Sequence, residues 1–151
     1  MNIIGVNVGS RSSVCLIQNG TITYFNQEER LSRIKNDSGI PYLCLEEIKK
    51  IETNIDILFV TGYNYNYSSG NSVLNLLNKI GFSIKEWYGY HKSHHLVHAA
   101  KAVNDSKFED ALILVQDGHG SSFYLNDGHE SVETTSVYSY NKHTGFECLY
   151  K

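Results

Sequence analysis

One pattern in this 151-residue chain restricts its fold more than any other, because the same succession of runs and turns occurs twice. An apolar run, a Gly-x-x-Ser-Ser turn, a second run and an x-Gly turn occupy residues 3–20 and again residues 112–128. Asn-Gly or Asp-Gly between extended runs is a strong signal for a hairpin. The repeat therefore predicts two antiparallel β-meanders, unless two hairpins resemble each other by chance.

Between the two repeats the spacing of apolar residues changes to that of helices. Helices are predicted at about 41–51, 71–80 and 93–104, with strands at 55–60 and 83–88 between them. Farther along only strands are expected, at 111–115, 122–125, 133–140 and 146–150. This change predicts two lobes, residues 1–105 and 106–151, with a boundary near 105–109.

A meander followed by helix, strand, helix, strand and helix is the order in which an actin-like ATPase, a duplicated ribonuclease-H-like fold, begins. The predicted fold class is therefore α/β and actin-like, with a complete first lobe and a second lobe truncated to a β-meander. In such folds each glycine turn presents backbone N–H groups to nucleotide phosphates, since small residues let the backbone approach the anion. A bare second meander exposes an apolar face, so we expect a separately encoded remainder of the protein, or a homo-oligomer, to cover it.

Composition excludes several classes of function. Thirteen Lys and Arg against sixteen Asp and Glu give a net charge of −3 without a basic stripe, which argues against non-specific nucleic-acid binding. Apolar runs are far shorter than the roughly 20 residues that span a bilayer, and no leader pattern opens the chain. We expect a soluble, cytoplasmic protein without membrane contact. Cys15, Cys44 and Cys148 lack Cys-x-x-Cys spacing and are interpreted as small core residues.

The densest polar signal is a histidine cluster, with four of the seven histidines in eight consecutive residues. On a helix His94 and His98 lie on one face, where both rings can bind one metal ion, and His91 falls on the same side. Asp117 follows a predicted buried strand and completes a two-histidine, one-carboxylate set suited to Fe(II) or Zn(II). His95 is expected to hydrogen-bond or pack elsewhere. The alternative is a solvated His-rich helix face beside a structural Asp.

A second candidate segment is the charged run from Glu28 to Asp37. Its alternating signs are typical of a solvated loop or helix. As a functional segment it offers Arg33 and Lys35, whose cationic side chains can bind phosphate or carbonyl oxygens.

Four motifs, in register across the whole chain, resemble the amino-terminal part of a known enzyme family. They are, in order, Ile3-Ile4-Gly5-Val6-Asn7-x-Gly9-x-x-Ser12-Ser13-x-Cys15-Leu16-Ile17, then Glu28-Glu29-Arg30-Leu31-Ser32-Arg33-Ile34-Lys35-x-Asp37-x-Gly39-Ile40-Pro41, then His94-His95-Leu96-x-His98-Ala99-Ala100, and Asp117-Gly118-x-Gly120-Ser121. The chain is similar in these motifs to the O-carbamoyltransferases that include the nodulation-factor and tobramycin enzymes. The first domain of that family resembles the tRNA threonylcarbamoyladenosine enzymes.

The resemblance implies an ATP- and carbamoyl-phosphate-dependent carbamoyltransferase. Such an enzyme forms carbamoyl adenylate and transfers the carbamoyl group to a hydroxyl of a small-molecule acceptor. The implied iron ligands in this chain are His94, His98 and Asp117, with a further ligand in a later segment that this chain does not contain. An ion held there would act as a Lewis acid on phosphate or carbamoyl oxygens.

The resemblance also implies a nucleotide site and a catalytic loop. The implied nucleotide-binding residues are Gly118, Gly120, Ser121 and, in the first glycine turn, Ser12. Arg33 and Lys35 fall in the loop expected on the carbamoyl-phosphate side and are the candidate catalytic residues.

Several departures separate the chain from that family. Members usually carry Gly-His-Asp-Ser-Ser in the first turn, where this chain has Ser10 and Arg11, so a histidine for proton transfer is missing. Asn36 stands where members often have His, and members are several times longer. The alternative function is a catalytically inactive remnant or regulatory module that keeps metal or nucleotide affinity. A third interpretation is that the chain is half of an actin-like kinase or hydrolase. The His-x-x-x-His motif counts against it, because those ATPase families do not need this motif.

Overall fold

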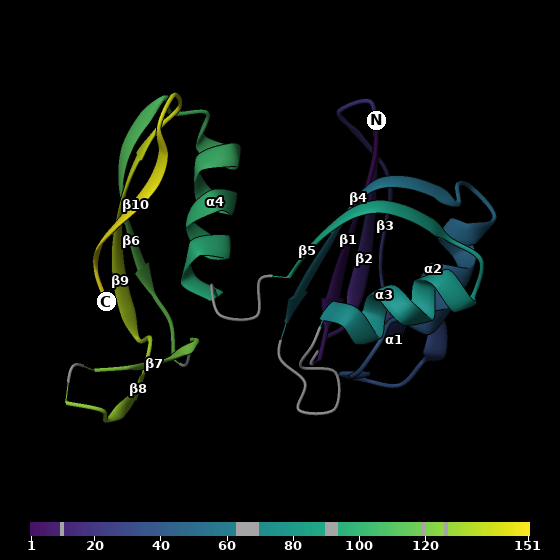
Figure 1. Cartoon of the computed structure of the whole chain (residues 1–151), viewed down its shortest axis with the longest axis horizontal. Helices are drawn as coiled ribbons and strands as arrows, with labels where there is room; N and C mark the ends of the chain where they lie inside the picture. The colour runs from purple at the N-terminus through teal and green to yellow at the C-terminus, as the bar shows by residue number, and fades with distance from the viewer. Residues whose placement is uncertain (10, 63–69, 90–93, 119, 126) are drawn as a thin grey trace. The chain divides into compact units, whose positions relative to one another are not determined.

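The computed structural model describes residues 1–9, 11–62, 70–89, 94–118, 120–125 and 127–151. The chain is mixed α/β and divides into two compact units, Met1–His91 and Lys92–Lys151 (Figure 1). This division lies earlier than the predicted boundary at residues 105–109. It assigns the third predicted helix to the second unit, because that helix buries Ala99 and Val103 against strands of the second unit.

In its described residues, the first unit contains one five-stranded sheet and three helices. In chain order its elements are β1 (Asn2–Val8), β2 (Ser13–Gln18), β3 (Thr21–Gln27), α1 (Glu28–Ser32), α2 (Tyr42–Lys49), β4 (Asn54–Gly62), α3 (Gly70–Lys79) and β5 (Ser83–Gly89). The sheet order is β3-β2-β1-β4-β5. The first three strands form the predicted antiparallel meander, whereas β4 lies parallel to β1 and β5 lies parallel to β4.

The core of the first unit lies on one face of this sheet. Val6 is paired with Val14 on one side and with Val60 on the other, and all three side chains are buried. Because side chains alternate between the faces of a strand, the same register brings a whole row of apolar residues to one side. Helices α2 and α3 cover that side with Cys44, Leu45, Ile48, Val73 and Leu77.

Two turns of the first unit depend on left-handed backbone. Asn19 and Gly20 have φ values of 51° and 82°, as a tight two-residue hairpin turn requires. The first glycine turn uses Gly9 at φ 103° to reverse the chain between β1 and β2. Gly9 also exchanges two backbone hydrogen bonds with Gly39, at 3.1 and 3.2 Å. The charged loop that contains Arg33 and Lys35 is thereby attached to the first glycine turn.

The second unit is a helix packed on an antiparallel sheet. Its elements are α4 (His94–Ser106), β6 (Asp110–Gln116), β7 (Ser122–Tyr124), β8 (Glu130–Val132), β9 (Thr135–Asn141) and β10 (Gly145–Tyr150). The three-stranded sheet has the order β10-β9-β6, and β7 pairs with β8. Helix α4 buries Ala99 and Val103 against Ile113, Val115 and Tyr138 of this sheet.

The prediction that the second repeat pairs like the first is wrong. Strand β1 pairs with its successor β2, but β6 pairs with β9, so the segment 117–121 carries the chain onward into β7 instead of reversing it. Between β7 and β8 the chain reverses near Gly128, which has a φ of 84°. The predicted strand 133–140 corresponds to β9, which begins two residues later, at Thr135, and β8 (Glu130–Val132) is a separate short strand before it.

Apolar residues of the second unit remain on its surface. Leu112 and Leu114 of β6 are 73% and 66% exposed, on the side of the strand opposite the buried Ile113 and Val115. This is the exposed apolar face that the truncated-lobe hypothesis expects, and what covers it stays a prediction. Among the cysteines only Cys44 is buried, whereas Cys15 is half-buried and Cys148 is exposed, so the core interpretation is wrong for Cys148.

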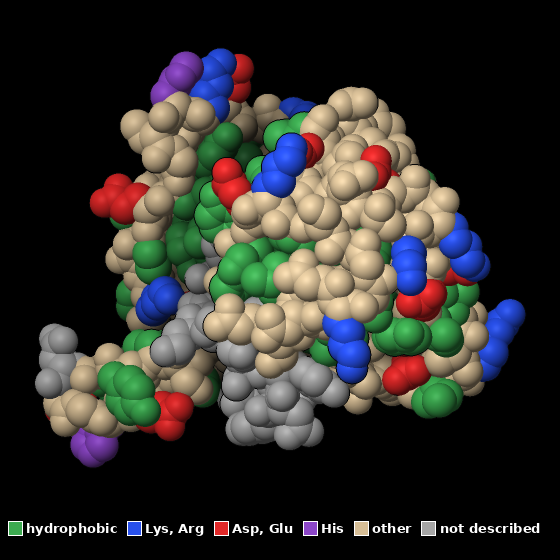
Figure 2. Space-filling model, turned by 45° about the vertical axis from the view of Figure 1, so that its right-hand side comes forward, with side chains coloured by type: hydrophobic (Ala, Val, Ile, Leu, Met, Phe, Trp, Pro, Cys, Tyr) green, Lys and Arg blue, Asp and Glu red, His purple; other side chains and the backbone are tan. Residues whose placement is uncertain are grey.

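Charged side chains are interspersed on the face of the molecule shown in Figure 2, where Lys and Arg alternate with Asp and Glu over the described residues. Within the part of the chain that the structure describes, none of the helices combines the length and the apolar character that a bilayer crossing demands.

Candidate metal centre

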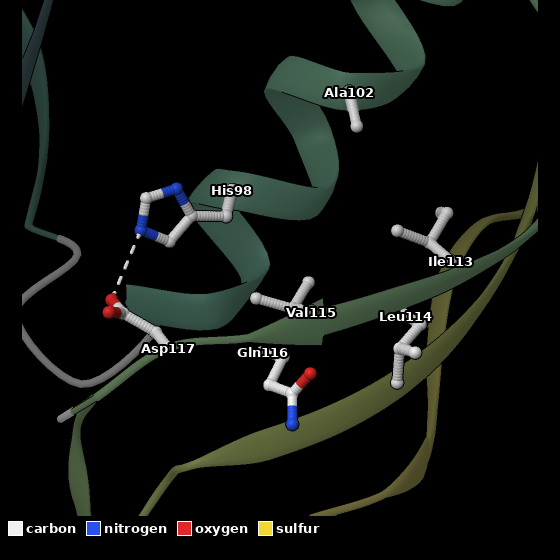
Figure 3. Close-up of a pocket in the computed structure, with 7 residues that line it drawn as sticks. All are labelled: His98, Ala102, Ile113, Leu114, Val115, Gln116 and Asp117. Atoms are coloured by element: carbon white, nitrogen blue, oxygen red, sulfur yellow. Dashed lines mark ion pairs between the residues drawn. The ribbon is translucent and has the colours of Figure 1, made fainter.

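Two segments of the second unit bring together the three predicted metal ligands. His94 and His98 lie one turn apart at the beginning of α4, and Asp117 directly follows β6. Nε2 of His94 lies 2.8 Å from Oδ2 of Asp117. Nε2 of His98 lies 3.6 Å from the same oxygen, and Figure 3 shows this pair. The two Nε2 atoms are 3.1 Å apart. Among the described residues, His94, His98 and Asp117 form a group whose possible metal-ligand atoms all lie within 4.8 Å of one another.

These distances suit a shared cation. Ligand atoms bound about 2.1 Å from one ion are separated by about 3.0 to 3.4 Å in octahedral or tetrahedral geometry. The three separations of 2.8, 3.1 and 3.6 Å bracket that range. Two imidazole nitrogens and a carboxylate are also the donor set that Fe(II) and Zn(II) accept. The residues present therefore fit the predicted ion, although binding itself stays a prediction.

Asp117 is held in its charged form. A hydrogen bond with His94 lowers the pKa of Asp117 below its usual value, and the N–H group of Gly118, 2.6 Å from Oδ1, acts in the same direction. A carboxylate that is ionised at neutral pH needs no deprotonation before it binds a cation. All three ligand side chains are exposed, so an ion can reach them from solvent.

A groove opens beside the two ligands His98 and Asp117 (Figure 3). Its volume is about 340 Å³, and Ala102, Ile113, Leu114, Val115 and Gln116 line the rest of it. One end is therefore polar and offers the metal ligands, whereas the remainder is mainly aliphatic. Such a groove can seat a ligand whose oxygen atoms meet the histidines and whose apolar part lies along β6.

In the predicted nucleotide turn, the backbone N–H groups of Gly118, Gly120 and Ser121 donate hydrogen bonds to residues of the second unit itself. The N–H of Gly118 donates to the Asp117 carboxylate, and the N–H of Gly120 donates to the carbonyl of Glu133 at 2.7 Å. The N–H of Ser121 donates to Oε2 of Glu133 at 3.1 Å. Phosphate binding by these groups would require exchanging these hydrogen bonds, so that role stays a prediction.

Gly120 also has a packing reason to be glycine. A Cβ atom there would lie 2.7 Å from Cβ of Glu133, 2.9 Å from its carbonyl oxygen and 2.8 Å from Nε2 of His95. These approaches are too close for any side chain. Gly118, in contrast, has open space around its Cα.

The remaining predicted site residues lie in the first unit. Ser12 is buried, and its hydroxyl donates to the carbonyl of Asp37 at 3.3 Å, so it connects the first turn to the charged loop. Arg33 ends α1 with a φ of 63°, and both Arg33 and Lys35 are exposed. Ser10 and His91 lie outside the described residues.

Glu133 is a buried polar residue that was missed from the sequence, whereas the expectation that His95 hydrogen-bonds or packs is confirmed. Glu133 is 1% exposed, and its Oε1 forms an ion pair with the ammonium of Lys151 at 2.5 Å. His95 is fully buried, with Nδ1 2.7 Å from the hydroxyl of Ser136, and burial lowers the pKa of this histidine. The only available signal was an acidic residue inside an expected strand, which does not reveal that the chain buries it.

Comparison with known proteins adds a distant structural likeness. No family model matches the chain, and no curated protein matches it. Among solved structures it is similar to YeaZ from Pseudomonas aeruginosa, with 9% sequence identity and a TM-score of 0.46. That alignment covers 100% of this chain and 67% of YeaZ. At this level of similarity the actin-like assignment stays a prediction, and no family membership follows.

Proposed function

We propose that this chain provides the metal-binding part of an ATP- and carbamoyl-phosphate-dependent O-carbamoyltransferase. The observation that carries the proposal is the convergence of His94, His98 and Asp117, whose ligand atoms lie within 4.8 Å of one another. The antiparallel meander of the first unit, followed by alternating helices and strands, supports an actin-like arrangement.

Each group of residues has a separate task under this proposal. The three ligands hold an Fe(II) or Zn(II) ion, which when bound supplies a Lewis acid for phosphate or carbamoyl oxygens. The exposed side chains of Arg33 and Lys35 offer positive charge to the phosphate of carbamoyl phosphate. The aliphatic groove beside His98 excludes water from one side of the bound group. The acceptor is a small molecule with a hydroxyl group.

A second candidate function is a metal-binding module without turnover. The observation that favours it is that Gly120 and Ser121 already donate their N–H groups to Glu133, which reduces their availability to phosphate. The buried hydroxyl of Ser12 likewise donates its hydrogen bond within the chain, to the carbonyl of Asp37. Under this reading the chain binds the ion but forms no carbamoyl adenylate.

Metal content tests the site. We expect the purified chain to carry iron or zinc, and His94→Ala or His98→Ala to remove it. His143→Ala is the matched control, because His143 is exposed and lies in the turn between β9 and β10. Elemental analysis that finds equal metal in the wild type and both ligand variants would count against the proposal.

Nucleotide products separate the two functions. Conversion of ATP to AMP and pyrophosphate that depends on carbamoyl phosphate supports the carbamoyltransferase. ADP release without carbamoyl phosphate supports a kinase-like activity instead. Retained metal with neither product supports the non-catalytic module. The assay is run on the chain alone and together with the product of any adjacent gene.

A further inference from the structure

The metal ligands come from two segments that need a fixed separation. His94 and His98 belong to the first turns of α4, whereas Asp117 precedes the segment 118–121 that leads to β7. A metal site loses affinity when its ligands are displaced by even a fraction of an ångström. The contacts that join the beginning of α4 to residues 117–121 therefore decide how well this site is preformed.

The carboxylate of Glu133 contacts both segments at once. Its Oε2 accepts a hydrogen bond from the N–H of Ser121 at 3.1 Å and a longer one from the N–H of His95 at 3.5 Å. The hydroxyl of Ser121 in turn accepts the N–H of His94 at 3.1 Å. The N–H groups of His94 and His95, the first two of α4, thus donate to Ser121 and Glu133, which lie outside the helix.

The carboxylate of Glu133 lies at the beginning of α4, where its negative charge stabilises the helix. The unpaired N–H groups at the beginning of a helix attract negative charge, and α4 is 13 residues long. Glu133 is buried, so water does not compete for its oxygens. Burial alone would raise the pKa of Glu133, but the ammonium of Lys151 and the N–H of Ser121 outweigh burial and hold the pKa below its usual value.

The backbone around Glu133 reinforces the attachment. The carbonyl of Glu133 accepts the N–H of Gly120 at 2.7 Å, and its own N–H donates to the carbonyl of Ser121 at 3.0 Å. The absence of a side chain at Gly120 allows this approach. Glu133 therefore fixes residues 120–121 through the backbone and α4 through its side chain.

We infer that Glu133 is a positioning residue, which fastens the beginning of α4 to Gly120 and Ser121. The N–H of Asp117 donates to the carbonyl of Thr134, the next residue, at 3.0 Å, so this attachment sets the separation of His94 and His98 from Asp117. This inference rests on the proposed metal site. Ser121 is the second member of the attachment, through its hydroxyl.

Cobalt binding to the full chain tests the role in the metal site. Glu133→Gln keeps the side-chain shape and removes the charge, and we expect Co(II) affinity to fall about ten- to hundredfold with a changed visible absorption band. Ser121→Ala is expected to weaken affinity in the same direction by a smaller factor. Val103→Ala is the control, because it removes core volume from α4 away from the ligands and should lower stability without changing Co(II) affinity or the band.

Hydrogen exchange without metal tests the attachment itself. Glu133→Gln should speed exchange selectively at the amides of His94, His95 and Ser121, whereas Val103→Ala should speed exchange throughout the second unit. Unchanged exchange at these amides, or unchanged Co(II) affinity in Glu133→Gln, would overturn the positioning role. Failure of the wild-type chain to bind Co(II) would overturn the metal site and with it the metal role of Glu133, while the exchange data would still report whether the two segments are fastened.

Discussion

Nε2 of His94 lies 2.8 Å from Oδ2 of Asp117, although 23 positions separate the two residues in the chain. The helix and the strand that carry them explain the approach. Helix α4 begins at His94, and a short connection joins its end to β6. Strand β6 runs back along the helix, so it ends beside the beginning of α4. The packing of Ala99 and Val103 on Ile113 and Val115 holds this helix–strand pair together. All three predicted ligands of the candidate metal site therefore come from the second unit.

Zinc should stabilise the wild-type second unit, and loss of a ligand should remove that effect. A ligand present at 100 times its dissociation constant stabilises the folded state by about 2.7 kcal/mol. His98→Ala should abolish the rise in melting temperature on zinc addition while changing the metal-free melting temperature little, because the His98 side chain is exposed. Differential scanning fluorimetry measures both quantities. His129→Ala, at an exposed histidine in the turn between β7 and β8, should keep the full response.

Alanine should be tolerated at Gly118 but not at Gly120. A Cβ at Gly120 would lie within 3.0 Å of Glu133 and His95, whereas at Gly118 it would meet nothing within 4 Å. We expect Gly120→Ala to lower the free energy of unfolding by about 1–3 kcal/mol, as overpacking does. Urea unfolding of both variants tests this difference. Equal stability of Gly118→Ala and Gly120→Ala would contradict the packing explanation.

Glu28 should be important for the first unit as a helix cap. Its two carboxylate oxygens accept the N–H groups of Leu43 and Cys44, at 2.8 and 3.0 Å, at the beginning of α2. Because Glu28 is buried, Glu28→Ala leaves both donors without a partner and should destabilise the protein by about 1–3 kcal/mol. Glu29→Ala is the neighbouring control, and thermal unfolding by circular dichroism is the measurement. A neutral Glu28→Ala would show that water replaces the cap.

The three cysteines should differ in reactivity. Burial raises the pKa of Cys44 to about 12, and the carboxylate of Glu28 adds to the shift, so this thiol stays protonated and inaccessible. Cys148 is exposed and should react first with a thiol reagent at pH 8. Cys15 is half-buried, and burial raises its pKa as well. Mass spectrometry after brief alkylation should find label on Cys148, and on Cys44 only after unfolding.

The stability of the second unit should fall in acid because of Glu133. Its folded pKa lies below the ordinary value of 4.5, so the unfolded chain binds the proton more readily. The stabilisation is therefore complete above about pH 4.5 and is lost as the pH falls through the folded pKa. Unfolding free energies measured from pH 6 to pH 3 should decline less steeply for Glu133→Gln than for the wild type. Parallel curves for the two proteins would contradict this contribution.

Local patterns predicted most of the individual elements. The Asn19-Gly20 turn, the strands on either side of it and the helix that carries His94 and His98 follow from residue preferences and spacing over a few positions. The four-residue spacing of the two histidines determines that they share a helix face wherever that helix packs. These features need no knowledge of distant parts of the chain.

The tertiary structure decided which strands pair and which polar groups are buried. The sequence repeat suggests that β6 pairs with β7, but β6 pairs with β9, because pairing depends on where the chain reverses and on which apolar face α4 covers. The burial of Glu133, its contact with the beginning of α4 and the packing need for glycine at position 120 exist only once these segments meet. Local sequence determines conformation through short-range sterics and hydrogen bonding, whereas the partners of a buried charge are set by long-range packing, which no short window of residues contains.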